Sequence, residues 1–354
     1  MIETITKLLQ EKMHFSNINK LFIFGAGDFG KRVSQYFIEK KIPIHNIIDN
    51  DENKSSDLVN DIPIISWKEF KSKGFVNYEI IICSTYSKEI EKQLLKENID
   101  NFTVFPISLL PCLNFETYYN ENIPRFEKFI SYLDQISQKT LKSVIDCRRT
   151  GDFSLLNISD YNQYIHPKVS PKEGDTIIDG GAFIGDTIEQ FNNFLNANCT
   201  IHSFEPTTEN FSHLLNTIDK YNYKNVIANN LGLDKTKNEL QIYFSHEEPA
   251  GSFLSQNGDE SIKVIDIDSY VEESSIESVD LIKLDIEGFE LNALRGAKQT
   301  ITKFKPKLQI CIYHSMEDLI EIFEYISSEW DYEFYVGHHS DVLWETVLYA
   351  TSKK

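Results

Sequence analysis

Apolar and polar positions along the chain follow one pattern that occurs twice. Short apolar runs such as Lys20–Gly25 and Asp280–Leu284 are typical of buried parallel strands, and they alternate with stretches whose apolar residues recur at helical spacing. Residues 115–170, between the two alternating regions, have helical spacing without a strand pattern. We therefore expect an α/β chain of two doubly wound, Rossmann-like domains joined by a helical connector, divided as 1–115, 116–170 and 171–354.

A glycine-rich loop follows the first predicted strand. It contains Gly25, Gly27 and Gly30 in a G-x-G-x-x-G pattern, and Asp49 ends the next predicted strand. In the dinucleotide fingerprint such a loop approaches a pyrophosphate, and the acid holds a ribose hydroxyl. The pattern predicts a nucleotide or nucleotide-sugar site, with a ligand-free unit used for packing or dimerisation as the alternative.

A second glycine-rich loop lies at residues 175–187, which read DTIIDGGAFIGDT. It joins a predicted buried strand to a helix, and a helix N-terminus offers free N–H groups and partial positive charge. Such a turn can hold a carboxylate, a phosphate or the methionyl end of S-adenosylmethionine, or it can be a tight turn without a ligand. Its candidate binding residues are Asp179, Gly180, Gly181, Ala182, Phe183, Gly185, Asp186 and Thr187.

Polar side chains end three further strands of the predicted second domain. Glu205 follows one strand, Asp285 and Glu287 follow another, and His314 follows a third. Ligands of open parallel sheets bind outside the carboxyl ends of the strands, so we expect these residues at one cleft. The segment Tyr161–Pro167 precedes the central strand, and we expect it over the mouth of this pocket.

The expected roles differ among these residues. The Glu205 carboxylate is suited to both hydroxyls of a ribose. Asp285, Glu287 and His314 are candidate catalytic residues, because a positioned carboxylate or imidazole can remove a hydroxyl proton during group transfer. Asp285 is alternatively a ligand of a divalent metal. The competing interpretation is structural, with the acids capping helices and His314 hydrogen-bonded in the core.

Composition narrows the choice of partner and compartment. The 354 residues carry a net charge of −19, which argues against a nucleic-acid or anionic-membrane partner. The five cysteines are scattered without a C-x-x-C pair, so neither a zinc knuckle nor a disulfide framework is predicted. No apolar run reaches membrane-spanning length, and no signal-peptide pattern begins the sequence. We expect a cytoplasmic protein, and the sequence is compatible with an oligomer.

Five stretches of the second half together resemble the FkbM-type methyltransferases. In chain order they are IIDGGAFIGDTIEQF, HSFEPTTENFSHL, LIKLDIEGFELNALRGA, LQICIYHSMEDL and HHSDVLWETVLYA. The resemblance implies the class I fold of S-adenosylmethionine-dependent methyltransferases. It also implies an enzyme that methylates hydroxyls, often on sugars or natural products. It implies that Asp179 to Thr187 hold the methionyl part of the cofactor and Glu205 its ribose, with Asp285 and Glu287 at the reaction centre. The sequence departs from the D-x-G-x-G-x-G form of the loop, because Phe183 replaces the middle glycine.

We therefore expect an S-adenosylmethionine-dependent O-methyltransferase whose acceptor is a small molecule or glycan, specifically a sugar or glycoconjugate precursor. The first alternative is an NAD-dependent oxidoreductase that uses the Gly25–Gly30 loop. The second is a catalytically inactive nucleotide-binding protein. The sequence does not identify the acceptor or settle metal dependence.

Overall fold

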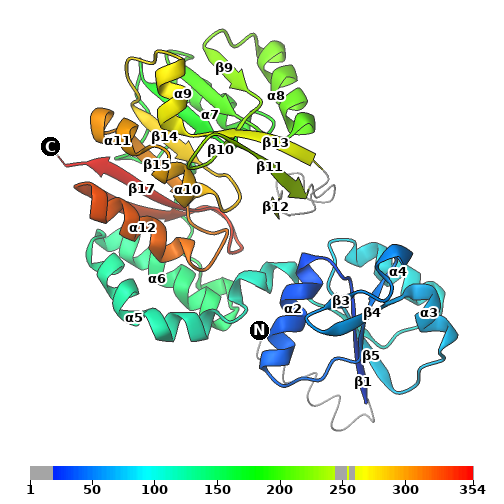
Figure 1. The fold of residues 1–354 in the computed structure, drawn as a ribbon. Helices are drawn as coiled ribbons and strands as arrows, with labels where there is room; N and C mark the ends of the chain where they lie inside the picture. Colours follow the sequence, from blue (N-terminus) through cyan, green and yellow to red (C-terminus); the bar gives the residue numbers. More distant parts are fainter. Residues whose placement is uncertain (1–18, 244–252, 255–259, 354) are drawn as a thin grey trace. The chain divides into compact units, whose positions relative to one another are not determined.

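The computed structural model describes residues 19–243, 253–254 and 260–353 (Figure 1). The chain divides into two compact units, the first formed by residues up to 121 with 146–154 and the second by 122–145 with 155–354. The division falls inside helices α5 (Phe115–Ser131) and α6 (Gln135–Thr150), whereas the sequence suggested residues 115 and 170. Among the described residues, no helix is both long enough and apolar enough to cross a membrane.

The first unit is built on a six-stranded sheet in the order β3-β4-β2-β1-β5-β6. Its strands pair in parallel, except that β3 pairs antiparallel with β4. The strands are β1 (Lys20–Phe24), β2 (Asn46–Asp49), β3 (Leu58–Val59), β4 (Ile62–Ser66), β5 (Tyr78–Ile82) and β6 (Phe102–Val104). The helices are α2 (Asp28–Glu39), α3 (Trp67–Ser72) and α4 (Ser87–Lys96), with 3₁₀ turns at Glu52–Lys54 and Ile107–Cys112.

The glycine-rich loop of this unit joins β1 to α2, as predicted. A side chain on Gly25, which has φ 121°, would collide with the carbonyl of Cys83, and one on Gly30 would collide with the carbonyl of Gly25. Gly27 differs, because an added Cβ would meet open space. Asp49 at the end of β2 accepts a hydrogen bond from the Ala26 N–H at 2.9 Å. Two glycines and the acid therefore hold the loop itself together, and the nucleotide site stays a prediction.

The second unit contains a seven-stranded sheet in the order β16-β17-β15-β14-β7-β8-β9. The strands from β15 to β9 are parallel, and β17 runs antiparallel between β15 and β16. They are β7 (Thr176–Gly180), β8 (Thr200–Phe204), β9 (Val226–Asn229), β14 (Leu281–Leu284), β15 (Lys307–Cys311), β16 (Tyr332–His338) and β17 (Thr346–Ser352). The predicted fold class, two doubly wound α/β domains, is confirmed.

Helices and a small second sheet complete the second unit. The helices are α7 (Asp186–Leu195), α8 (Thr208–Tyr221), α9 (Ile267–Glu273), α10 (Glu290–Arg295), α11 (Lys298–Phe304) and α12 (Asp318–Glu329), with a 3₁₀ turn at Phe153–Leu155. The small sheet has the order β10-β13-β11-β12, from β10 (Gly232–Leu233), β11 (Asn238–Tyr243), β12 (Phe253–Leu254) and β13 (Glu260–Ile265). Apolar residues such as Ile177, Phe191 and Leu281 are fully buried between the layers, because burial of both sheet faces removes apolar area from water.

The two glycines at the start of α2 generate a prediction about stability. Replacing Gly30 by Ala should lower the stability of the first unit by about 2 kcal/mol or more, because the new methyl group cannot fit against the Gly25 carbonyl. Replacing Gly27 by Ala should change it by less than about 0.5 kcal/mol. Chemical denaturation followed by circular dichroism measures both, and equal losses would contradict the packing argument.

Candidate functional site

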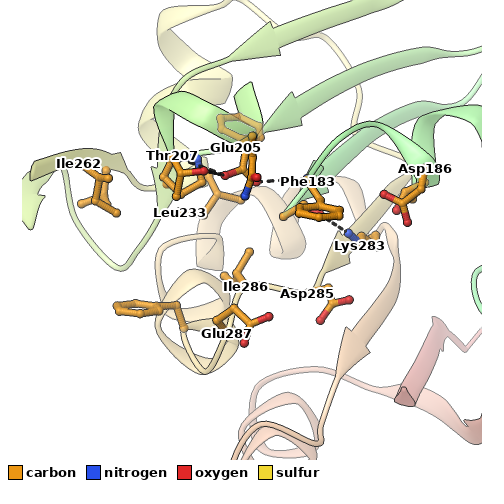
Figure 2. A pocket seen from close by; sticks show the side chains of 18 of the residues that line it. Phe183, Asp186, Glu205, Thr207, Leu233, Ile262, Lys283, Asp285, Ile286 and Glu287 are labelled. Atoms are coloured by element: carbon orange, nitrogen blue, oxygen red, sulfur yellow. Dashed lines mark hydrogen bonds between the residues drawn. The ribbon is translucent and has the colours of Figure 1, made fainter. Parts of the chain in front are cut away.

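A cavity of about 300 Å³ opens at the carboxyl ends of the central strands of the second unit. Its walls come from the loops after β7, β8, β14 and β15, from the small sheet, and from residues 163–164. Figure 2 shows Glu205 and Phe183 on one side of the cavity and Asp285 and Glu287 on the other. The strand-end residues Glu205, Asp285 and Glu287 thus lie around one pocket, whereas His314, which was expected at the same cleft, is not among the residues that line it.

The loop after β7 is tightly folded against its neighbours. Gly181 has φ 74°, and an added Cβ would collide with the Asp285 carbonyl, so only glycine lets the loop approach β14 this closely. The N–H groups of Gly181 and Ala182 both donate to the Phe204 carbonyl at 3.0 Å. These two N–H groups are therefore committed to the fold, and the loop presents side chains and carbonyl groups more than free donors. Gly181, Phe183, Asp186 and Thr187 line the cavity.

Asp179 is fully buried at the end of β7 and does not line the cavity. Its Oδ1 lies 3.1 Å from Nζ of Lys283, which is 1% exposed. Lys283 also donates to the carbonyls of Gly180 at 3.1 Å and Gly181 at 2.7 Å. Burial alone would lower the pKa of Lys283, but the carboxylates of Asp179 and Asp285 outweigh it and raise that pKa. Asp179 thus acts on the cavity through the Lys283 cation, which holds the glycine loop in place.

Glu205 joins two loops through its carboxylate. Oε1 accepts hydrogen bonds from the N–H of Thr207 at 3.0 Å and from its hydroxyl at 2.6 Å. Oε2 accepts from the Phe183 N–H at 3.1 Å. Burial raises the pKa of Glu205, and the hydrogen bonds from Thr207, Asn210 and Phe183 partly offset this. These donors come from the loop after β7, the loop after β8 and the start of α8, so Glu205 fixes the position of the β7 loop.

Asp285 lies between two tyrosine hydroxyls. Tyr164 donates to Oδ2 at 3.0 Å, and Tyr313 donates to Oδ1 at 2.9 Å. Burial by itself would raise the pKa of Asp285, but His314, Lys283 and the Tyr313 hydroxyl hold it well below its usual range. Asp285 is therefore ionised at every physiological pH, and it is a weaker base than a free carboxylate.

His314 extends this network behind the cavity. Its Nε2 lies 3.4 Å from Oδ1 of Asp285 and 3.7 Å from Oε2 of Glu287, and its Nδ1 lies 3.1 Å from Oε1 of the fully buried Glu290. Burial favours the neutral ring, but Glu290, Asp285 and Glu287 raise the pKa of His314 well above its ordinary value. Asp285, Glu290 and His314 also offer ligand atoms within 4.8 Å of one another, a spacing that a metal ion can use.

Several residues of the site could not be predicted from the sequence. Lys283 sits inside an apolar strand, and its pairing with Asp179 depends on two strands distant in sequence. Glu290 belongs to α10, where an acid in the first turn resembles an ordinary helix-start residue. Glu345 reaches the cavity from the loop between β16 and β17. By contrast, the segment Tyr161–Pro167 was expected over the pocket, and its Tyr164 does line it.

Gln309 and the sheet hold that segment in place. The buried Gln309 side chain donates to the carbonyls of Tyr164 at 3.0 Å and Val169 at 2.9 Å. Tyr349 of β17 donates to the Gln163 carbonyl at 2.5 Å. Tyr164 therefore reaches Asp285 from a segment anchored on two strands of the sheet.

The candidate residues of the first unit form a separate group. Gly25, Gly27, Gly30 and Asp49 gather at the ends of β1 and β2. Their expected role in nucleotide binding, like the binding roles of the β7 loop residues, stays a prediction.

Comparisons with known proteins bear on the second unit most directly. Residues 179–334 match the family described as methyltransferase FkbM domain. The second unit therefore contains a methyltransferase domain of the FkbM type. Residues 17–105 match the family described as C2185-like, N-terminal. No curated protein sequence matches the chain.

Solved structures are similar to this chain to different degrees. The methyltransferase FkbM from Methylobacillus flagellatus KT has 21% sequence identity and a TM-score of 0.64, over 97% of this chain and 92% of that one. An rRNA methylase from Streptococcus thermophilus has 10% identity and a TM-score of 0.34, over 51% of this chain and 88% of that one. Fibrillarin from Aeropyrum pernix, in complex with natively bound S-adenosyl-L-methionine, has 15% identity and a TM-score of 0.34, over 51% of this chain and 67% of that one.

The buried ion pair of this methyltransferase generates a prediction. Replacing Lys283 by Met should destabilise the second unit by about 3–5 kcal/mol, because it leaves the Asp179 carboxylate buried without its cation. The double variant with Asp179→Asn should recover most of that loss. Denaturant unfolding of the two single variants and the double variant measures the coupling, and purely additive losses would contradict a direct pairing.

Proposed function

We propose that the second unit methylates a hydroxyl group of a sugar or glycoconjugate precursor, with S-adenosylmethionine as the methyl donor. The observation that carries this proposal is the position of Asp285, whose ionised carboxylate lines the same cavity as Glu205 and the β7 loop. A donor held along Glu205 and that loop extends toward Asp285, where an acceptor hydroxyl can meet the transferred methyl group.

The residues present fit this cofactor. Glu205 lines the cavity and supplies a carboxylate for a ribose hydroxyl, and apolar Leu233 and Ile262 lie on the same side of the cavity and suit a base (Figure 2). The described residues that line the cavity include a single lysine, Lys283, and no arginine. Lys283 is paired with Asp179 and donates hydrogen bonds to two carbonyls. The surplus of carboxylates favours a ligand with positive charge.

In this reaction the acceptor hydroxyl needs more help from the protein than the methyl donor does. Bound S-adenosylmethionine supplies an electrophilic methyl group whose leaving group is a neutral thioether. An alcohol is a poor nucleophile at neutral pH, so the protein must orient its hydroxyl and accept its proton. A hydroxyl that donates to Asp285 turns an oxygen lone pair toward the methyl group. As the carbon–oxygen bond forms, its proton passes to the Asp285 carboxylate.

His314 supports Asp285 in this scheme and does not replace it. Its raised pKa means that the ring already carries a proton at neutral pH, and a protonated imidazole cannot act as a base. Glu290 fixes one ring nitrogen, and the other faces Asp285 and Glu287. A divalent ion held by Asp285, Glu290 and His314 is the competing arrangement, in which the metal would lower the pKa of the acceptor hydroxyl.

The charge of the chain and of the cavity bears on the class of acceptor. The net charge of −19 and the acidic cavity disfavour a nucleic acid or another polyanion. Incubation with methyl-labelled S-adenosylmethionine and a panel of neutral sugars, sugar nucleotides and short RNAs tests this, with mass spectrometry of the products. Transfer to RNA alone, or to nitrogen or carbon atoms alone, would contradict the proposal.

The Glu205 carboxylate generates a prediction about binding. Glu205→Ala should weaken S-adenosylmethionine binding by about 1.5–3 kcal/mol, because a charged hydrogen bond to the ribose is lost. The matched control is Glu209→Ala, which changes an exposed acid in the first turn of α8. Isothermal titration calorimetry measures both, and equal affinities for the Glu205 and Glu209 variants would remove Glu205 from the site.

Asp285 generates a prediction about turnover. Asp285→Asn keeps the size of the side chain but removes its charge, and it should lower kcat about 100-fold with nearly unchanged cofactor affinity. The exposed Asp219→Asn on α8 is the control. The metal alternative predicts that EDTA abolishes activity of the unmodified enzyme and that Mg²⁺ or Mn²⁺ restores it. Normal kcat in the Asn variant, with no effect of EDTA, would exclude both arrangements.

A further inference from the structure

Three non-glycine residues that line the cavity have a left-handed backbone, and each lies on a different loop. They are Phe183 with φ 46°, Glu287 with φ 57° and Glu345 with φ 59°. This conformation is unfavourable for most residues with a Cβ, and it persists where the surrounding structure enforces it. Phe183 is the clearest case, because glycine or asparagine would adopt the same backbone at lower cost.

Hydrogen bonds of the loop hold Phe183 in this conformation. Its own N–H donates to Oε2 of Glu205 at 3.1 Å. The carbonyl of Ala182, the preceding residue, accepts from the Gly185 N–H at 2.8 Å. The backbone therefore keeps the path that the expected glycine would give it, although the residue is phenylalanine.

The aromatic ring is not explained by packing of the core. Among the described residues, the buried apolar cluster of the second unit includes Ala182 and Phe191 but not Phe183. The ring instead lines the cavity, and Figure 2 shows it between Glu205 and Asp186. A costly backbone conformation with a side chain turned into the pocket indicates a function of the ring in ligand binding.

The charges around the ring indicate which ligand feature it meets. The carboxylates that line the cavity are Asp186, Glu205, Asp285, Glu287 and Glu345. Lys283, the lysine among the lining residues, is bound to Asp179 and to the Gly180 and Gly181 carbonyls. The cavity therefore favours positive charge, and the face of an aromatic ring attracts a cation, more strongly where water is excluded.

We propose that the ring of Phe183 recognises the sulfonium charge of the methyl donor, so that the pocket discriminates between S-adenosylmethionine and the uncharged thioether S-adenosylhomocysteine. This inference rests on the proposed function, because it requires the donor to lie along Glu205 and the β7 loop. In that position Phe183 stands at the junction between the ribose end at Glu205 and the methionyl end at Asp186, where the sulfur lies. Product release then becomes easier, because the ring interaction weakens once the methyl group has left.

Two variants of the full chain separate the ring from the backbone. Phe183→Leu keeps an apolar side chain but removes the aromatic face. Phe183→Asn removes the ring and suits the left-handed backbone. In both, affinity for S-adenosylmethionine should fall about fivefold more than affinity for S-adenosylhomocysteine, which is the factor a modest cation–π interaction supplies. The control is Ile184→Asn, because Ile184 is 39% exposed and does not line the cavity.

Calorimetric titration with each nucleoside and thermal unfolding of each variant decide the outcome. We expect the unfolding temperature of Phe183→Asn to equal or exceed that of the unmodified chain, since strain is relieved. Equal losses for the two nucleosides, or a lowered unfolding temperature in Phe183→Asn, would show that the ring serves packing and would overturn the inference. If Phe183→Leu does not fold, Phe183→Asn decides alone. Binding of neither nucleoside to the unmodified chain would instead overturn the proposed function, and this inference with it.

Discussion

The buried pair of Lys283 and Asp179 is the interaction on which the active end of the second unit depends. One cation joins three elements. From its position on β14, Lys283 contacts the Asp179 carboxylate and the Gly180 carbonyl of β7, and the Gly181 carbonyl of the loop that follows. Removing two ions from water costs free energy, so the buried pair is stable only while both ions are present and well oriented. The result is a glycine loop that is fixed in position at one wall of the cavity.

Alternating positive and negative charges also fix the groups next to that pair. Lys283 and His314 both keep their protons, and Asp285 between them keeps its charge. Two tyrosine hydroxyls add neutral donors to the same carboxylate. Asp285 is consequently held in one orientation by groups from three segments of the chain. These contacts lower the basicity of the Asp285 carboxylate and fix its orientation. Such a carboxylate suits the proposed methyl transfer, in which the main task of the protein is to orient the acceptor hydroxyl.

Much of this was readable from the sequence, and the exceptions have a common cause. Glu205, Asp285 and Glu287 could be placed at one pocket because each lies within three residues of the end of an apolar run, and parallel strands end at the same edge. The role of Asp179 could not be predicted, because the same sequence pattern, an acid before a glycine loop, occurs whether the acid faces a ligand or a buried lysine. Lys283, Glu290 and Glu345 were missed because their importance arises from contacts between segments distant along the chain. Phe183 was recognised as a departure, yet only the backbone reveals that it keeps the conformation of a glycine.

The strand order also has a consequence for how the enzyme is made. β7 pairs with β14, so Ile177 must find Leu281, a closure over roughly 100 residues that costs chain entropy before it gains any hydrogen bond. β17 then enters between β15 and β16, which precede it along the chain. On the ribosome, the first unit can acquire its sheet early, whereas the second must wait until β17 has emerged. During that interval β15 and β16 lack the strand that pairs with both of them, so the second unit exposes unpaired strand edges, a state that is prone to aggregation.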